Sequence, residues 1–268
     1  MPPSPVLEGK CAVVFGAGGS IGAAVAKEFA AEGAQVFLAG RTAEPVELVA
    51  KEITANGGSA HAQVVDALDP NGVDQLVQSI VEHAGSIDVE FNAVGPRISE
   101  YGNGKLATEL SVEEFMTGLD TVVKSQFITA RAAARQMVAQ RSGVIVFLTG
   151  SPARPHTPGT TAIGAAFGAV ETLMRTMALE LGPLGVRAVC VRTAANPDTR
   201  TIQETAEVLA AMMHITSEEA IAGLAQGTML KVSPRTADTA KAATFVASDR
   251  ARMMTGTVLN SSAGAVSD

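Results

Sequence analysis

The sequence predicts an α/β fold, a Rossmann-type doubly wound parallel sheet of about seven strands with helices on both faces. Short β-rich runs alternate with longer stretches whose apolar residues recur at helical spacing. A glycine-rich turn follows the first of these runs. Because parallel neighbours need a crossover connection, such alternation is typical of a parallel sheet. With 268 residues and 47% hydrophobic content, the chain is long enough for one well-buried core. We therefore expect a single domain over residues 1–268.

The expected strands and helices follow one another along the chain. The strands are short β-rich runs at residues 11–15, 35–39, 61–65, 87–92, 143–148, 186–191 and 257–259. The helices, read from apolar spacing, cover residues 21–32, 45–56, 73–84, 112–139 and 164–181.

Two segments depart from this alternation. One is a Gly-rich loop at residues 95–105, and the other is residues 193–226, which contain an inserted pair of short helices at 203–213 and 217–224. Both follow strands on the carboxyl side of the sheet, where open α/β folds bind ligands. We expect them to form the substrate rim.

Composition excludes several classes of protein. The formal charge of -7 and the lack of a Lys/Arg cluster disfavour a nucleic-acid partner. The first five residues lack the charge of a secretory signal, and apolar runs are broken before the roughly 20 residues that span a bilayer. We expect a cytoplasmic protein without a membrane partner. Cys11 and Cys190 lie in apolar strand-like runs, which favours buried reduced thiols over a disulfide or metal site.

The glycine-rich turn predicts a dinucleotide site. Gly16, Gly18, Gly19 and Gly22 lie between a strand and a helix, where glycines allow tight turning and close approach to a pyrophosphate. The second strand ends near Arg41 with no carboxylate to take the ribose hydroxyls. Because Arg can pair with a 2′-phosphate, NADP(H) is favoured over NAD(H). The alternative for Arg41 is a solvated loop charge.

At these motifs the chain resembles the classical short-chain dehydrogenase/reductase family, over about residues 7–265. The family's Thr-Gly-x-x-x-Gly-x-Gly turn corresponds to residues 15–22, with Phe15 in place of Thr and Ser20 in place of the middle Gly. Asp66 matches the family's adenine-contacting Asp, and residues 92–95 resemble its Asn-Asn-Ala-Gly. Residues 180–187 and 255–260 resemble the entry to its sixth strand and its last strand.

The resemblance implies a set of cofactor-binding residues. They are Gly16, Gly18, Gly19, Ser20, Ile21, Gly22, Arg41, Asp66, Ala67, Asn92, Ala93, Val94, Gly95, Thr149, Thr193, Ala194 and Thr199. Residues 192–199 replace the family's proline-glycine turn over the nicotinamide, and their polar groups could still hold the carboxamide.

The family's catalytic residues do not carry over. Aligned without gaps, Ile163 and Phe167 occupy the positions of its Tyr and Lys, and Gly150 and Val122 those of its Ser and Asn. A shift of one or two residues could recruit Ser151. No Tyr or Lys occurs anywhere between Arg141 and Lys231, whatever the alignment.

Other polar residues are weak catalytic candidates. His156 could act as an acid near neutral pH, but a His between prolines is more often a surface residue. Ser151 lacks an obvious base, and its alternative is a packing or backbone-bonding role. Tyr101, the only tyrosine, is either a lid residue or a solvent-exposed ring. Lys124 is expected at the surface.

Two functions remain open. The first is an NADP(H)-dependent oxidoreductase that transfers hydride to a small carbonyl- or imine-type substrate without the usual Tyr/Lys proton donor. The second is a catalytically silent cofactor- or ligand-binding subunit. The resemblance implies a homodimer or homotetramer with a small-molecule substrate.

Overall fold

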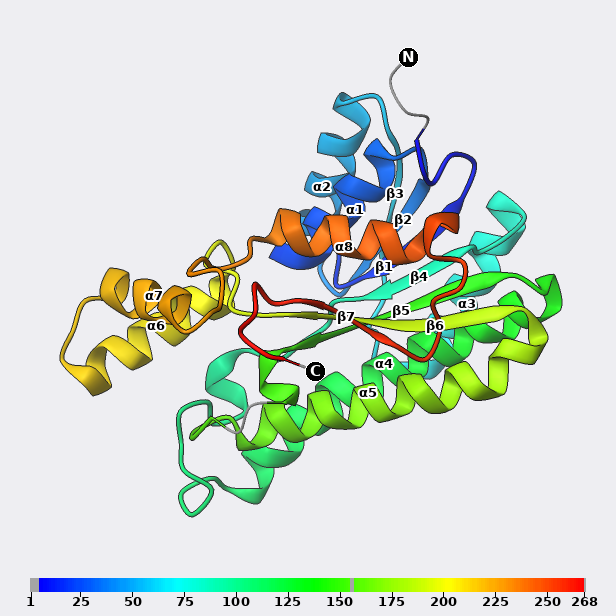
Figure 1. Cartoon of the computed structure of the whole chain (residues 1–268). Coiled ribbons are helices and arrows are strands. Elements are labelled where there is room, and N and C mark those ends of the chain that lie inside the picture. Colours follow the sequence, from blue (N-terminus) through cyan, green and yellow to red (C-terminus); the bar gives the residue numbers. More distant parts are fainter. Residues whose placement is uncertain (1–4, 155–156, 268) are drawn as a thin grey trace.

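The computed structural model describes residues 5–154 and 157–267, and within them seven strands form one parallel sheet (Figure 1). The strands are β1 Cys11–Phe15, β2 Gln35–Gly40, β3 Ser59–Val64, β4 Val89–Asn92, β5 Gly143–Gly150, β6 Val186–Thr193 and β7 Val258–Ser261. Their order across the sheet is β3-β2-β1-β4-β5-β6-β7, and every neighbouring pair is parallel. The predicted fold class is confirmed.

Helices cover both faces of the sheet (Figure 1). The long helices are α1 Ser20–Ala31, α2 Ala43–Ala55, α3 Pro70–Ala84, α4 Val112–Gln140, α5 Thr161–Leu181, α6 Arg200–Met213, α7 Ser217–Gln226 and α8 Thr236–Ala247. One hydrophobic cluster joins the sheet to α1, α2 and α8, and a second joins it to α3, α4 and α5. Because strand side chains alternate between faces, β4 gives Phe91 to the first cluster and turns Glu90 away from it.

Local signals explain the helix starts that apolar spacing misses. The helix expected at 73 begins at Pro70, because Asp69 accepts a hydrogen bond from the Asn71 backbone N–H and Pro fits the first helical turn. Thr199 caps α6 in the same way. The rim helices α6 and α7 extend beyond the sheet in Figure 1. Both helices lie where the pair of short helices is expected, and their role as a substrate rim stays a prediction.

Helix α8 lies in a stretch for which no helix was predicted. Its sequence, Thr-Ala-Asp-Thr-Ala-Lys-Ala-Ala-Thr-Phe-Val-Ala, is dominated by small residues and carries only a weak apolar stripe. It nevertheless supplies the crossover that a parallel β6–β7 pair requires. The small residues Ala240 and Ala243 are fully buried in the cluster shared with α1.

One helix, α5, lies in a stretch, Thr161–Leu184, long and apolar enough to cross a bilayer by length and composition alone. In the fold α5 packs against α4 and β6, and Val170 and Met174 are fully buried. Apolar core helices of soluble proteins meet the same criterion.

Candidate functional site

The glycine turn lies at the topological switch point between β1 and β4. A Cβ atom at Gly16 would lie 2.9 Å from the Ala93 carbonyl carbon, and Gly16 has a φ of +73°. At Gly22 a Cβ atom would lie 2.3 Å from the Gly16 carbonyl oxygen. Only glycine therefore fits these two positions. The turn packs directly against Ala93 and Val94, which follow β4. Open α/β folds bind ligands at such a crevice.

The start of α1 fits a dinucleotide's pyrophosphate. Gly19 is the N-cap residue, so no side chain caps the first backbone N–H groups of the helix. Gly18, Gly19 and Ser20 are exposed. Free N–H groups and the helix dipole together favour an anion here. Arg41 is exposed directly after β2, on the same edge of the sheet.

Several of the expected cofactor residues use their side chains inside the protein. Asn92 is fully buried: its Oδ1 accepts from the Val94 backbone N–H at 2.7 Å, and its Nδ2 donates to Thr129 Oγ1 at 2.9 Å. Asp66 is exposed and accepts from the Leu68 N–H at 3.0 Å. These two side chains shape the loops after β4 and β3.

The loop after β6 is organised in the same manner. Thr193 Oγ1 lies 2.8 Å from Thr239 Oγ1, and Asn196 Nδ2 donates to the Pro234 carbonyl at 2.9 Å. Thr199 Oγ1 donates to the Asn196 carbonyl at 2.8 Å. The hydroxyls of Thr193 and Thr199 are thus engaged internally, which leaves backbone groups of this loop, including those of half-buried Ala194, to face a ligand.

Around residue 150 the side chains are packed together. A Cβ atom at Gly150 would lie 2.9 Å from Phe167 Cε2, so the aromatic ring fills the space that a larger residue would need. Ile163, one turn earlier on α5, is 8% exposed and belongs to the hydrophobic cluster below the sheet. Val122 is buried in the same cluster. Hydrocarbon therefore occupies this part of the site.

A buried ion pair lies one turn further along α5. Arg192 is fully buried and binds Glu171 with two hydrogen bonds, Nε to Oε1 at 2.8 Å and Nη2 to Oε2 at 3.0 Å. Arg175 donates to Glu171 Oε2 at 3.3 Å. Thr149 Oγ1 lies 3.4 Å from Glu171 Oε1, so this expected cofactor residue also turns its hydroxyl inward. Two-point Arg–carboxylate pairs fix geometry, and this one holds β6 against α5.

Of the weak catalytic candidates, Ser151 is half-buried, and within the described residues its hydroxyl has no hydrogen-bond partner. Tyr101 is 6% exposed, so the expectation of a solvent-exposed ring is wrong. Burial, with a smaller contribution from the charge of Glu204, raises the pKa of Tyr101 to about 12, which makes it a poor acid. Lys124 is exposed as predicted. His156 lies outside the described residues.

Two glycines join the loop after β4 to the loop before α5. The Gly104 N–H donates to the Gly159 carbonyl at 2.9 Å, and a Cβ atom at Gly159 would lie 2.7 Å from Gly104 Cα. On its other side Gly104 approaches Val208 of α6. We call this contact the glycine clasp. It joins the loop after β4 to the loop before α5, and Gly104 brings both loops against α6.

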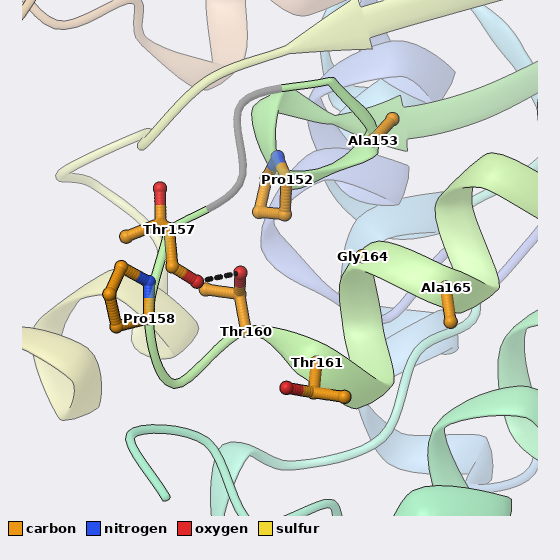
Figure 2. A pocket seen from close by; sticks show the side chains of 8 residues that line it. All are labelled: Pro152, Ala153, Thr157, Pro158, Thr160, Thr161, Gly164 and Ala165. Carbon is orange, nitrogen blue, oxygen red and sulfur yellow. Dashed lines mark hydrogen bonds between the residues drawn. The ribbon is translucent and has the colours of Figure 1, made fainter. Parts of the chain in front are cut away.

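Beside the clasp lies an open cavity of about 500 Å³ (Figure 2). Figure 2 shows it between Pro152 and Ala153, the segment from Thr157 to Thr161, and Gly164 and Ala165 of α5. Thr160 Oγ1 donates to the Thr157 carbonyl at 2.7 Å along one wall. Neither Ile163 nor Phe167 lines the cavity. Its size suits a small molecule.

Sequence reasoning missed Glu90, the Glu171–Arg192 pair and the glycine clasp. Glu90 and Arg192 are charged residues next to apolar residues of strand-like runs, and that placement was a usable signal of buried polar roles. The clasp leaves no comparable signal, because Gly104 and Gly159 are brought together only by the tertiary fold.

Comparison with known proteins identifies the family. Residues 10–228 match the model of the short chain dehydrogenase family, and the chain belongs to this family. A short chain aldehyde dehydrogenase of Euphorbia lathyris is 30% identical, over 95% of this chain and 87% of that protein. A versicolorin reductase of Emericella nidulans is 29% identical, over 97% of this chain and 96% of its own. Membership places the chain among the oxidoreductases of this family.

Solved structures agree on the fold. The crystal structure of an NAD⁺-bound xylitol dehydrogenase has a TM-score of 0.88 and 25% identity, covering 95% of this chain and 98% of its own. An actinorhodin polyketide ketoreductase with NADPH has a TM-score of 0.88 at 21% identity, covering 96% and 97%. The fold of this family thus binds NAD(P). Of these two neighbours, the first contains NAD⁺ and the second NADPH.

Proposed function

We propose that this chain is an NADP(H)-dependent oxidoreductase that transfers hydride to a small carbonyl- or imine-type substrate without the Tyr/Lys proton donor of its family. The observation that supports it is the contrast between an intact glycine cradle and the Phe167 ring packed on Gly150. By resemblance, positions 150, 163 and 167 of this chain correspond to the family's catalytic Ser, Tyr and Lys. In this chain they are Gly150, Ile163 and Phe167.

The residues present fit NADP(H). Backbone groups of residues 16–22 would bind the pyrophosphate, Arg41 the 2′-phosphate, and the loop after β6 the carboxamide. When bound, the cofactor supplies or accepts the hydride. Ile163 and Phe167 would pack the floor of the site without a polar group. Cavity residues such as Pro152, Thr160 and Thr161 would hold the acceptor in place. Such positioning can contribute roughly 7 to 11 kcal/mol, against the roughly 10²- to 10⁴-fold that a general acid provides.

The loss of a proton donor favours particular acceptors. A ketone gains negative charge on oxygen as hydride arrives and needs a donor, whereas an iminium ion loses its charge and does not. Where the acceptor needs a proton, solvent is the source we propose, and the half-buried Ser151 hydroxyl would hydrogen-bond the donating water. We expect cyclic imines to be reduced faster than ketones of the same ring size.

The test follows NADPH oxidation with matched pairs of a cyclic imine and its carbocyclic ketone. The imine should react faster, and its rate should fall as pH rises past the imine's own pKa. Faster ketone turnover would refute the imine preference while keeping the oxidoreductase. No turnover of either class, with NADPH bound, would favour the second function.

That second function is a catalytically silent cofactor- or ligand-binding subunit. It is favoured by the burial of Ile163 and by the glycine clasp, because both restrict approach to the middle of the site. Ile163 and Phe167 are then packing residues only.

Assembly and compartment are part of the proposal. Val112, Met116 and Phe127 of α4 and Leu179 of α5 expose large apolar side chains, from 40% to 79% of their surface. We propose that these helices form the contact of a homodimer or homotetramer in the cytoplasm. Light scattering of wild type and Phe127→Glu tests this, because a charge in such a contact should lower the measured mass.

A further inference from the structure

A second cavity, of about 250 Å³, lies at the amino edge of the sheet, opposite the dinucleotide turn. Its walls come from Lys10 before β1, the start of β4, the start of β5 and Arg187 of β6. Asp249 and Arg252, which follow α8, close it from the side. It shares no residue with the cavity beside the glycine clasp.

Five charged side chains line this cavity, and three of them are already engaged. Asp88 Oδ2 accepts from the Cys11 N–H at 2.8 Å and from Ser86 Oγ at 3.1 Å. Arg187 donates to the carbonyls of Met254, Val246 and Ser248, at 3.0, 2.9 and 3.3 Å. Asp249 interacts with the Arg187 charge, and the two compensate each other.

The remaining two are both cations. Within residues 5–154 and 157–267, Lys10 and Arg252 have neither an ion pair nor a side-chain hydrogen bond. They belong to segments far apart in sequence, yet they line the same small cavity. Two cations without a partner in one small cavity favour an anion between them, because the anion would be attracted to both.

We propose that this cavity binds a phosphate-like oxyanion between Lys10 and Arg252. The Ser142 hydroxyl, which also lines the cavity, can donate to the same ion. An ion held there ties the segment before β1 to the segment after α8. The site is independent of the proposed oxidoreductase function, because it lies on the other edge of the sheet.

Thermal unfolding of the full chain, without cofactor, tests this with inorganic phosphate against chloride at equal ionic strength. A saturable rise of the unfolding midpoint is expected in phosphate. At free phosphate about ten times its dissociation constant, the folded-to-unfolded ratio should rise about tenfold. Lys10→Gln and Arg252→Gln should remove this rise. In chloride alone, both variants should have an unfolding midpoint close to that of wild type, because neither cation has an ion pair or side-chain hydrogen bond to lose within the described residues.

Two control variants separate this site from other cations. Arg41→Gln changes the exposed cation at the nucleotide edge, and Lys51→Gln changes an exposed lysine of α2. Both should keep the phosphate effect. The proposal is overturned if wild type shows no saturable rise, if the rise persists in Lys10→Gln and Arg252→Gln, or if Arg41→Gln alone abolishes it. Sulfate, an oxyanion of similar size, should raise the unfolding midpoint as phosphate does.

Discussion

The turn after β1 and the segment after β5 lie on the same edge of the sheet but are packed in opposite ways. After β1, Gly18 and Gly19 are exposed, and no side chain caps the backbone N–H groups at the start of α1. After β5, Gly150 is covered by the Phe167 ring, and Ile163 is almost fully buried. A change in the first region should therefore alter binding, and a change in the second should alter packing.

The largest effect is expected at Glu90, in β4 at the centre of the sheet between the two regions. This carboxyl is 1% exposed, and its Oε1 has no partner within the described residues. Burial raises the pKa of Glu90 to about 8, partly offset by a hydrogen bond with Thr129. The folded protein keeps this proton at pH values where the unfolded chain has lost it. Its stabilising contribution is thus complete below about pH 4.5 and is lost as pH rises to about 8.

Glu90→Gln should remove this pH-dependent loss of stability. Between pH 4.5 and 8, the unfolding free energy of the variant should rise relative to that of wild type by about 4 kcal/mol. Urea unfolding across this range measures it. Glu47→Gln, at an exposed site on α2, is the control and should show no such trend. A constant difference for Glu90→Gln would mean that Glu90 ionises in the fold at ordinary pH.

Gly22→Ala tests the first region. The added methyl group would lie 2.3 Å from the Gly16 carbonyl oxygen and 2.8 Å from the Gly16 carbonyl carbon, and backbone cannot move aside as a side chain can. We expect a loss of about 3 kcal/mol in urea unfolding, with loss of NADPH binding. Gly168→Ala in α5 meets nothing within 4 Å and should stabilise by roughly 0.5 to 1 kcal/mol. Equal effects of the two variants would contradict the turn's tight packing.

A double-mutant cycle tests the second region. Gly150→Ser places its Cβ atom 2.9 Å from Phe167 Cε2 and should cost about 1 to 3 kcal/mol of stability. In a Phe167→Ala background the same substitution should cost less, with a coupling of about 1 to 2 kcal/mol. Additive effects would show that the ring moves aside freely, and that residues 150 and 167 do not determine each other.

The same contrast explains what the sequence could predict. The parallel sheet and the glycine turn between its first strand and first helix follow from patterns that are local in the chain, and the structure confirms them. The Gly150–Phe167 contact and the burial of Tyr101 depend on how separate segments meet, which periodicity does not encode. The α8 helix was missed because all its buried residues except Val246 are alanines and threonines, whose spacing gives little hydrophobic contrast. The sequence shows that Ile163 and Phe167 are unusual at the family's Tyr and Lys positions. It does not show that Phe167 packs on Gly150.

The smallest expected effect returns to the first region, at Arg41. This exposed cation after β2 is the group we expect to pair with the 2′-phosphate of NADPH, and no acidic side chain ends β2 to take a free ribose hydroxyl. Fluorescence titration should show NADPH binding more tightly than NADH. Arg41→Asp should reverse this order, and Arg41→Gln should weaken NADPH by about tenfold, or about 1.4 kcal/mol, with NADH unchanged. Because Arg41 is exposed, the effect should shrink as salt screens the pair. If both cofactors bind equally in wild type and in both variants, Arg41 is a solvated loop charge, and the first region binds a dinucleotide without selecting its phosphate.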